Sequence, residues 1–322
     1  MSVDMISVVL PVHNAEESIK EAIEAVLYQD YPCFELIISD DCCSDGSRKI
    51  IESFHASDER VKVVSSAHRL GVSHARNLAL DVCRGTYVAF VDADDVPAPN
   101  WLSTLVSSIE GVDLAACGYD VMDATDQLLY STADRSDVAG EDGMCTLDAS
   151  QFVTDLFSNR LMYQGYVWNK LFRRDLLEVK EPLRFKQGVA YNEDRLFIFN
   201  YLKRCCVVRV DMKPVYAYHS HPGADSYDEV QATELGAFDE MLTDLKNDVE
   251  LGSNSALFYA EKDYFRAAVE LYDKASAAKS ADAEWLGQDV NRFKAYKGEF
   301  LDYPTSFQEK IQRVVSEVKA DS

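Results

Sequence analysis

Apolar segments with strand character alternate with helical segments along the first hundred residues. The compact runs of β-branched, aliphatic and aromatic residues, which are typical of strands buried on both faces, are residues 5–10, 34–39, 61–64 and 87–91. The segments with apolar residues at helical spacing are residues 16–28, 44–55 and 71–83. Because strands separated by helices are joined by right-handed crossovers, this alternation predicts an α/β fold with a doubly wound, mainly parallel sheet.

The rest of the chain contains fewer strands and more helices. Its predicted elements are helices at 101–109, 151–161 and 192–202, strands at 114–122 and 207–210, and a polar loop or irregular hairpin at 123–147. From about Asp228 onward, apolar residues recur only at helical spacing. We therefore predict an α/β domain at residues 1–226 and a helical C-terminal region at residues 227–322.

The composition narrows the classes of partner and compartment. With 55 acidic and 32 basic residues the net charge is −23, which disfavours unspecific binding to nucleic acid or anionic lipid. The eight cysteines form no C-x-x-C pair and no zinc-ligand spacing, which indicates free thiols in a reducing cytosol. We expect no signal peptide and, because no apolar run reaches 18 residues, no membrane-spanning segment.

Polar residues follow three of the predicted strands at the point where each strand ends. The strand at 87–91 leads directly into Asp92, Asp94 and Asp95, and the strands before it end at residues 11–14 and 40–41. Carboxylates packed so closely repel one another, and Mg²⁺ or Mn²⁺ would relieve that repulsion. A solvated acidic turn is the alternative. Since ligands of open α/β sheets bind at the carboxyl ends of strands, we expect one cleft here.

Four segments of the N-terminal third resemble family 2 glycosyltransferases of the GT-A fold. These segments are residues 6–14, 37–47, 71–77 and 90–95. Three further segments are similar to bacterial members that build capsule, exopolysaccharide or lipopolysaccharide, namely residues 168–174, 192–194 and 216–219. The resemblance extends to about residue 226, and the remaining residues match nothing in it.

The resemblance implies transfer of a hexosyl or N-acetylhexosaminyl group from a nucleotide-diphosphate sugar to a hydroxyl. The implied donor is a UDP-sugar, the implied cofactor is Mn²⁺ or Mg²⁺, and the acceptor is a glycan or lipid-linked glycan. The implied reaction is a single displacement with inversion. The enzyme would be cytoplasmic, and it would lie at the inner face of the plasma membrane when its acceptor is lipid-linked. The resemblance is also compatible with assembly into a homo-oligomer.

The resemblance also assigns roles around the nucleotide. Asp41 matches the carboxylate that accepts the uracil N–H, with a helix N-cap as the alternative. Pro11 and Val12 would flank the base. Asp92 matches the acid that hydrogen-bonds the ribose hydroxyls, and it is the second candidate residue of the metal site. Asp94 matches the metal ligand itself.

Five further residues are candidate contacts of the nucleotide. Asp95 either assists the metal site or caps the following turn. Arg76 resembles a basic residue near the nucleotide pocket, with a surface ion pair as the alternative, and Lys170 is either a nucleotide contact or a plain surface lysine. His219 and His221 stand where related enzymes often carry arginines, so they would bind the metal or diphosphate more weakly and with a pH dependence.

A general base is needed to take the proton from the acceptor hydroxyl. Glu193 and Asp194 match the family's Glu-Asp pair, in which the aspartate is the base. Because adjacent helical residues point about 100° apart, we expect only one to face the cleft. Asp194 is the predicted base, Glu193 the second choice, and an ordinary acidic helix start the alternative.

Two rival functions remain compatible with the residues. A catalytically inactive sugar-nucleotide binder is suggested by the histidines at 219 and 221. A phosphoacceptor signalling domain also carries acids at strand ends, but that fold ends near 120 residues and leaves Asp194 without a purpose.

Overall fold

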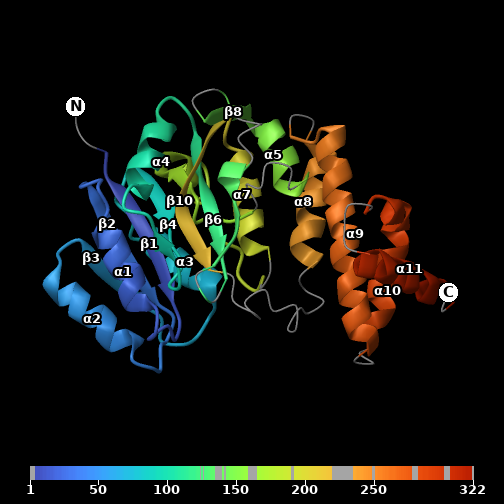
Figure 1. The fold of residues 1–322 in the computed structure, drawn as a ribbon, viewed down its shortest axis with the longest axis horizontal. Helices are drawn as coiled ribbons and strands as arrows, with labels where there is room; N and C mark the ends of the chain where they lie inside the picture. Colours follow the sequence, from blue (N-terminus) through green and yellow to red (C-terminus); the bar gives the residue numbers. More distant parts are fainter. Residues whose placement is uncertain are drawn as a thin grey trace.

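Among the residues described in this computed structural model, ten strands form one mixed sheet, with helices on both of its faces (Figure 1). The described residues are 4–123, 125, 127–134, 140, 143–158, 165–189, 192–219, 235–248, 251–277, 282–300 and 305–320.

Four parallel strands form the N-terminal half of the sheet, in the order β3-β2-β1-β4. They are β1 (Ile6–Val12), β2 (Phe34–Asp40), β3 (Val61–Ser65) and β4 (Tyr87–Phe90). The helices between them are α1 (Ile19–Leu27), α2 (Ser47–Ser57) and α3 (Val72–Leu80). Alternate residues of β1 enter different cores, Val8 and Leu10 with α1 and α2, and Val9 with α3. Both faces are therefore covered, and the predicted doubly wound fold is confirmed.

Strand β1 continues through Pro11, where the sequence predicted its end. The Val9 carbonyl oxygen accepts a hydrogen bond from the Val91 N–H, so the backbone groups of Val9 point toward β4. Pro11 lies two residues later in the same strand, and its backbone groups therefore point the same way. Because β4 ends at Phe90, the missing N–H of Pro11 leaves no ladder bond unmade. Pro11 and Val12 thus extend β1 beyond β4 at the edge where the acids lie.

The second half of the sheet is mixed. Strand β9 (Lys170–Arg173) runs antiparallel between β4 and β6 (Leu114–Met122), and β10 (Val207–His219) lies parallel to β6. The remaining elements here are β5 (Val96–Pro97), β7 (Leu128–Ser131), β8 (Met144–Asp148), α4 (Trp101–Ile109), α5 (Ala149–Ser158), α6 (Arg174–Glu178) and α7 (Glu193–Leu202).

Two predictions for this half need correction. The predicted short strand at 207–210 extends to His219, because register shifts around Pro214 let it keep pairing with β6 past the proline. The segment at 123–147, predicted as a loop or irregular hairpin, contains β7 and the start of β8, which pair with β6 and β10. Both strands are short edge elements, for which the sequence pattern is weak.

The described C-terminal region is helical, as predicted. It contains α8 (Leu235–Asn247), α9 (Asn254–Ala277), α10 (Asp282–Phe293), the 3-10 helix η4 (Lys294–Gly298) and α11 (Thr305–Ala320). Figure 1 shows these helices to one side of the sheet, beyond α5 and α7. Phe152, Phe199, Leu242 and Tyr264 belong to one continuous core that joins them to the sheet. The predicted boundary at residue 226 lies outside the described residues, and none of the described helices could cross a membrane.

Candidate active site

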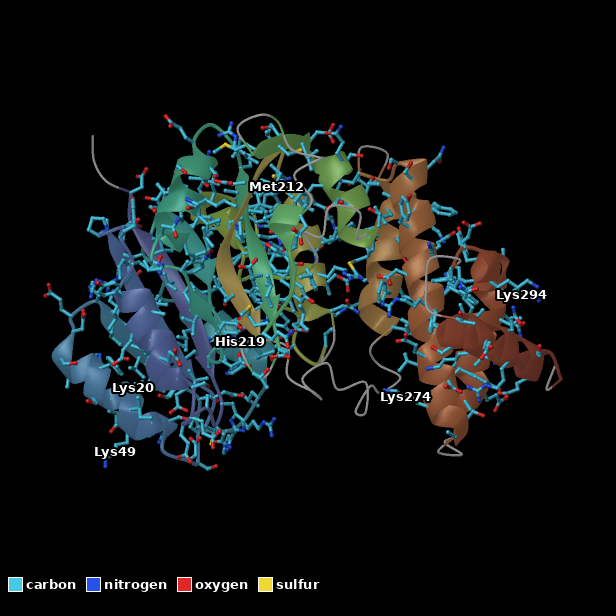
Figure 2. The ribbon with its side chains drawn as sticks, in the orientation of Figure 1. Lys20, Lys49, Met212, His219, Lys274 and Lys294 are labelled. Atoms are coloured by element: carbon cyan, nitrogen blue, oxygen red, sulfur yellow. The ribbon has the colours of Figure 1, made fainter. Side chains whose placement is uncertain are left out.

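The ends of β1, β2 and β4 meet at one edge of the sheet. A cavity of about 490 Å³ opens there, lined by residues that include His13, Asn14, Asp45, Ala93 and Asp94. Figure 2 shows His219, the last residue of β10, in the lower part of the view. Of the predicted strand-end residues, Asp94 and the turn residues His13 and Asn14 line this cavity, whereas Asp41 and Asp92 are not among its lining residues.

Asp41 follows β2 and is almost fully buried. Its carboxylate accepts hydrogen bonds from the backbone N–H groups of Leu70 (2.9 Å) and Gly71 (2.8 Å), just before α3. The N-cap of α2 is Gly46, so the N-cap alternative for Asp41 is wrong. Each carboxylate oxygen has a second lone pair, so Asp41 keeps the capacity to accept one more hydrogen bond.

Arg76, on α3, connects the strand-end acid Asp92 to the start of α7. Its guanidinium donates to Asp92 Oδ1 (3.1 Å), Glu193 Oε1 (3.3 Å) and Asp194 Oδ1. Only 3 % of Arg76 is exposed, so the alternative of a surface ion pair is wrong. Burial disfavours its charge, but the carboxylates of Asp194, Asp92 and Glu193 outweigh this and raise the pKa of Arg76.

Glu193 and Asp194 form the first turn of α7, after Asn192 in the left-handed conformation (φ 62°). Both carboxylates contact Arg76, although adjacent helical residues point about 100° apart. The long arginine accounts for this, because one guanidinium nitrogen, Nη1, lies within reach of both. Burial raises the pKa of Asp194 to about 8, with Arg76 acting in the opposite direction, and also raises the pKa of Glu193.

Asp95 faces the interior and is 1 % exposed. Its Oδ2 accepts a hydrogen bond from the Tyr216 hydroxyl (2.9 Å), and its Oδ1 accepts one from the His219 N–H (3.2 Å). Burial and the neighbouring Asp92 and Asp94 raise the pKa of Asp95. Both oxygens of Asp95 therefore anchor β10 to the end of β4, a structural contact that the sequence did not predict.

Lys170 is fully buried at the start of β9, so the surface-lysine alternative is wrong. Its Nζ donates to the Tyr166 carbonyl oxygen (2.6 Å) and to Asn169 Oδ1 (2.8 Å). Burial lowers the pKa of Lys170 to about 7. The predicted nucleotide contact is also contradicted, since the ammonium lies inside the protein on acceptors of its own segment.

Pro11, Val12, Asp92 and Asp94 are the other predicted site residues that the structure describes. Pro11 and Val12 end β1, directly before the cavity residues His13 and Asn14. Asp94 is exposed at the cavity, and the Asp92 side chain is 28 % exposed. His221 lies outside the described residues.

Sequence reasoning assigned no role to His13 and Tyr216. His13 lines the cavity, with its Nδ1 2.8 Å from the Asp41 carbonyl oxygen. The Tyr216 hydroxyl, besides its bond to Asp95, accepts the backbone N–H of Asp92 (3.4 Å). Both residues lie inside segments that carried the resemblance, and this was the signal available.

The family model for "Glycosyl transferase family 2" matches residues 7–178, more than half of the chain. This chain belongs to glycosyl transferase family 2. The match extends well past the length of a phosphoacceptor domain, so that alternative is wrong.

Two curated relatives of this family 2 chain illustrate the similarity. It is 26 % identical to "Uncharacterized glycosyltransferase EpsJ" of Bacillus subtilis over 231 residues, which is 69 % of this chain and 63 % of EpsJ. It is 37 % identical over 103 residues to "UDP-Glc:alpha-D-GlcNAc-diphosphoundecaprenol beta-1,3-glucosyltransferase WfgD" of Escherichia coli, covering 32 % of this chain and 40 % of WfgD. The chain thus spans less than two thirds of either relative.

The fold is similar to that of S. aureus TarS 1–349, a structure solved in complex with UDP-GlcNAc. The TM-score is 0.67 at 17 % identity, covering 98 % of this chain and 92 % of that one. The predicted GT-A architecture with a helical C-terminal region is therefore confirmed.

Proposed function

We propose that this protein transfers a sugar from a UDP-sugar to a hydroxyl of a glycan or lipid-linked acceptor, with inversion and with Asp194 as general base. One observation carries the proposal. Arg76 joins Asp92, at the end of β4, to Asp194, which lies 118 residues from Arg76 in the sequence. The proposed base and the strand-end acid Asp92 thus contact one guanidinium.

The base role of Asp194 follows from its surroundings. A carboxylate that takes a proton from a hydroxyl is most effective when its pKa lies near the working pH. Burial raises the pKa of Asp194 toward that range, while Arg76 and the Val167 N–H (3.4 Å from Oδ2) fix its direction. Its side chain is 15 % exposed, so it is not completely closed off from solvent.

The donor is proposed to bind along the ends of β1, β2 and β4. Asp41 would accept the uracil N–H, Pro11 and Val12 would flank the base, and Asp92 would contact the ribose. WfgD is named for a UDP-Glc donor and a diphosphoundecaprenol acceptor, and TarS was solved with UDP-GlcNAc. These names support a UDP-sugar donor and a lipid-linked acceptor for this chain.

The residues at the cavity fit a divalent cation. Mg²⁺ is commonly held by one or two carboxylates together with substrate phosphates, and Asp94 presents such a carboxylate at the cavity, two residues after Asp92 in the chain. Asp94 would be the main ligand. A cation bound there would neutralise charge on the departing diphosphate.

Screening UDP-, GDP- and dTDP-sugars by thermal shift, with and without Mn²⁺, tests the donor class, and NMR of the product's anomeric centre tests inversion. Stabilisation by a UDP-sugar followed by turnover supports the proposal. Donor binding with neither transfer nor hydrolysis would favour the inactive binder instead.

Asp94→Asn is expected to abolish the metal-dependent part of stabilisation by UDP. At a ligand concentration about 100-fold above Kd, binding adds about 2.7 kcal/mol to the free energy of unfolding of the wild type. The measurement is a UDP titration by thermal shift, with and without Mn²⁺. Asp175→Asn, a surface carboxylate paired with Arg173, is the control and should keep the full shift. An equal shift in Asp94→Asn would remove Asp94 from the metal site.

Transfer activity is expected to rise with pH through about pH 8. Asp194 acts as a base only when ionised, and burial raises its pKa to about 8, so activity falls as the pH drops below this value. Initial rates between about pH 6 and about pH 9 measure this limb. A rate that stays flat over that range would contradict Asp194 as the base.

A further inference from the structure

The turn at residues 166–169 lies between the proposed base and the strand-end acids. On one side, the Val167 N–H donates to Asp194 Oδ2 at 3.4 Å. On the other side, Trp168 stacks on Tyr216 with ring centroids 4.5 Å apart, and the Tyr216 hydroxyl donates to Asp95. The position of this turn therefore affects where Asp194 lies relative to the end of β4.

Lys170 holds this turn from inside the protein. Its Nζ donates to both ends of the turn, the Tyr166 carbonyl oxygen at 2.6 Å and Asn169 Oδ1 at 2.8 Å. The side chain of Asn169 donates from Nδ2 to the Cys117 carbonyl oxygen at 3.1 Å. The backbone carbonyl oxygen of Asn169 accepts the Cys117 N–H at 2.9 Å. The turn is thus tied through Lys170 and Asn169 to the middle of β6.

A lysine at this position is costly, because burying an ammonium ion is unfavourable. Burial lowers its pKa to about 7, opposed by the Cys117 thiol on β6, Asp194 on α7 and Asp155 on α5. An apolar side chain would avoid this cost but would leave the two acceptors of the turn without a donor. A buried ammonium whose hydrogen bonds go to both ends of one turn points to a role in holding that turn.

We propose that Lys170 is a positioning residue for the general base: it holds the 166–169 turn that places the Val167 N–H against Asp194. A hydrogen bond from that N–H favours the carboxylate form of Asp194. This inference rests on the proposed function, because Asp194 has the base role only there.

The test compares Lys170→Met with Lys203→Met in the full chain. Lys203 lies at the other end of α7 and pairs with Asp244 at the surface (2.7 Å), so its substitution should leave the rate and its pH dependence unchanged. Lys170→Met is expected to lower kcat by about tenfold to a hundredfold, because small displacements of a base are costly. The UDP-sugar thermal shift with Mn²⁺ should stay as in the wild type.

The pH profile separates positioning from a merely structural role. Arg76, Glu193 and Asp92 still face Asp194 in Lys170→Met, but a displaced turn no longer holds the Val167 N–H, which lowers the pKa of Asp194, against its carboxylate. The pKa of Asp194 should therefore rise, and the acidic limb of the kcat profile should move to higher pH. A lower melting temperature with normal kcat and an unmoved limb would overturn the proposal.

A second variant guards against a folding defect. Lys170→Met removes a cation that interacts with the buried Asp155, and Lys170→Met/Asp155→Asn removes both charges. If the single variant does not fold, the double variant is judged by the same kcat and pH criteria. If neither folds, Lys170 acts in stability and the proposal is overturned. A wild type that binds UDP-sugar but shows no transfer would refute the proposed function itself, and with it the base that Lys170 positions.

Discussion

Replacing Asp194 with asparagine is expected to lower the rate of sugar transfer at least about a hundredfold while donor binding stays close to normal. The amide cannot take the proton from the acceptor hydroxyl. It does retain an oxygen for Arg76 and a similar shape, so the start of α7 should be preserved. Initial transfer rates measure the loss, and thermal shift with UDP-sugar and Mn²⁺ measures the donor site separately.

Glu193→Gln is the matched control for this prediction. Glu193 lies in the same helical turn as Asp194 and also contacts Arg76. The two differ in that the Val167 N–H donates to Asp194. Its neutralisation should cost much less activity. A larger loss in Glu193→Gln than in Asp194→Asn would assign the base role to Glu193, and retained activity in both would place the base elsewhere.

Replacing Arg76 with methionine is expected to lower the free energy of unfolding by about 3–5 kcal/mol, because removing one partner leaves buried charges uncompensated. Three carboxylates, those of Asp92, Glu193 and Asp194, would then lie together without their shared cation. The cost should be larger above pH 8 than at pH 6, because burial raises the pKa of Asp194 to about 8 and protonation relieves the repulsion. Urea unfolding at the two pH values measures both effects.

Arg173→Met provides the comparison. Arg173 pairs with Asp175 at the surface (2.7 Å), where such pairs contribute about 0–1 kcal/mol. Its loss should change stability little, and equally at both pH values. A similarly small and pH-independent effect of Arg76→Met would show that the three carboxylates do not depend on Arg76.

Periodicity and strand ends were the informative features of the sequence. The alternation of the first hundred residues predicted where the four parallel strands begin and end to within one or two residues. This was possible because burial on both faces leaves an unbroken apolar run. The order of strands and acids along the chain then placed Asp41, Asp92 and Asp94 at one edge. That placement depends on local pattern and on the geometry of parallel sheets, both of which a sequence displays.

The surroundings of single charged residues were less predictable. Arg76 and Lys170 were each given a surface alternative, yet both are buried, and Asp95 is buried as well. The partners responsible lie far along the chain: Asp194 for Arg76, and Tyr216 for Asp95. No local pattern marks a buried charge when its compensating group comes from a distant segment.

The sequence by itself determined the fold class, the family and the set of acids from which a site could be built, because these depend on local periodicity and on short motifs. Only the tertiary structure decided which charges face one another. It placed both Glu193 and Asp194 on Arg76, and it placed Lys170 beneath the turn that contacts Asp194. The physical reason is that the free energy of a buried charge depends on the few groups within hydrogen-bonding distance, and folding alone brings those groups together.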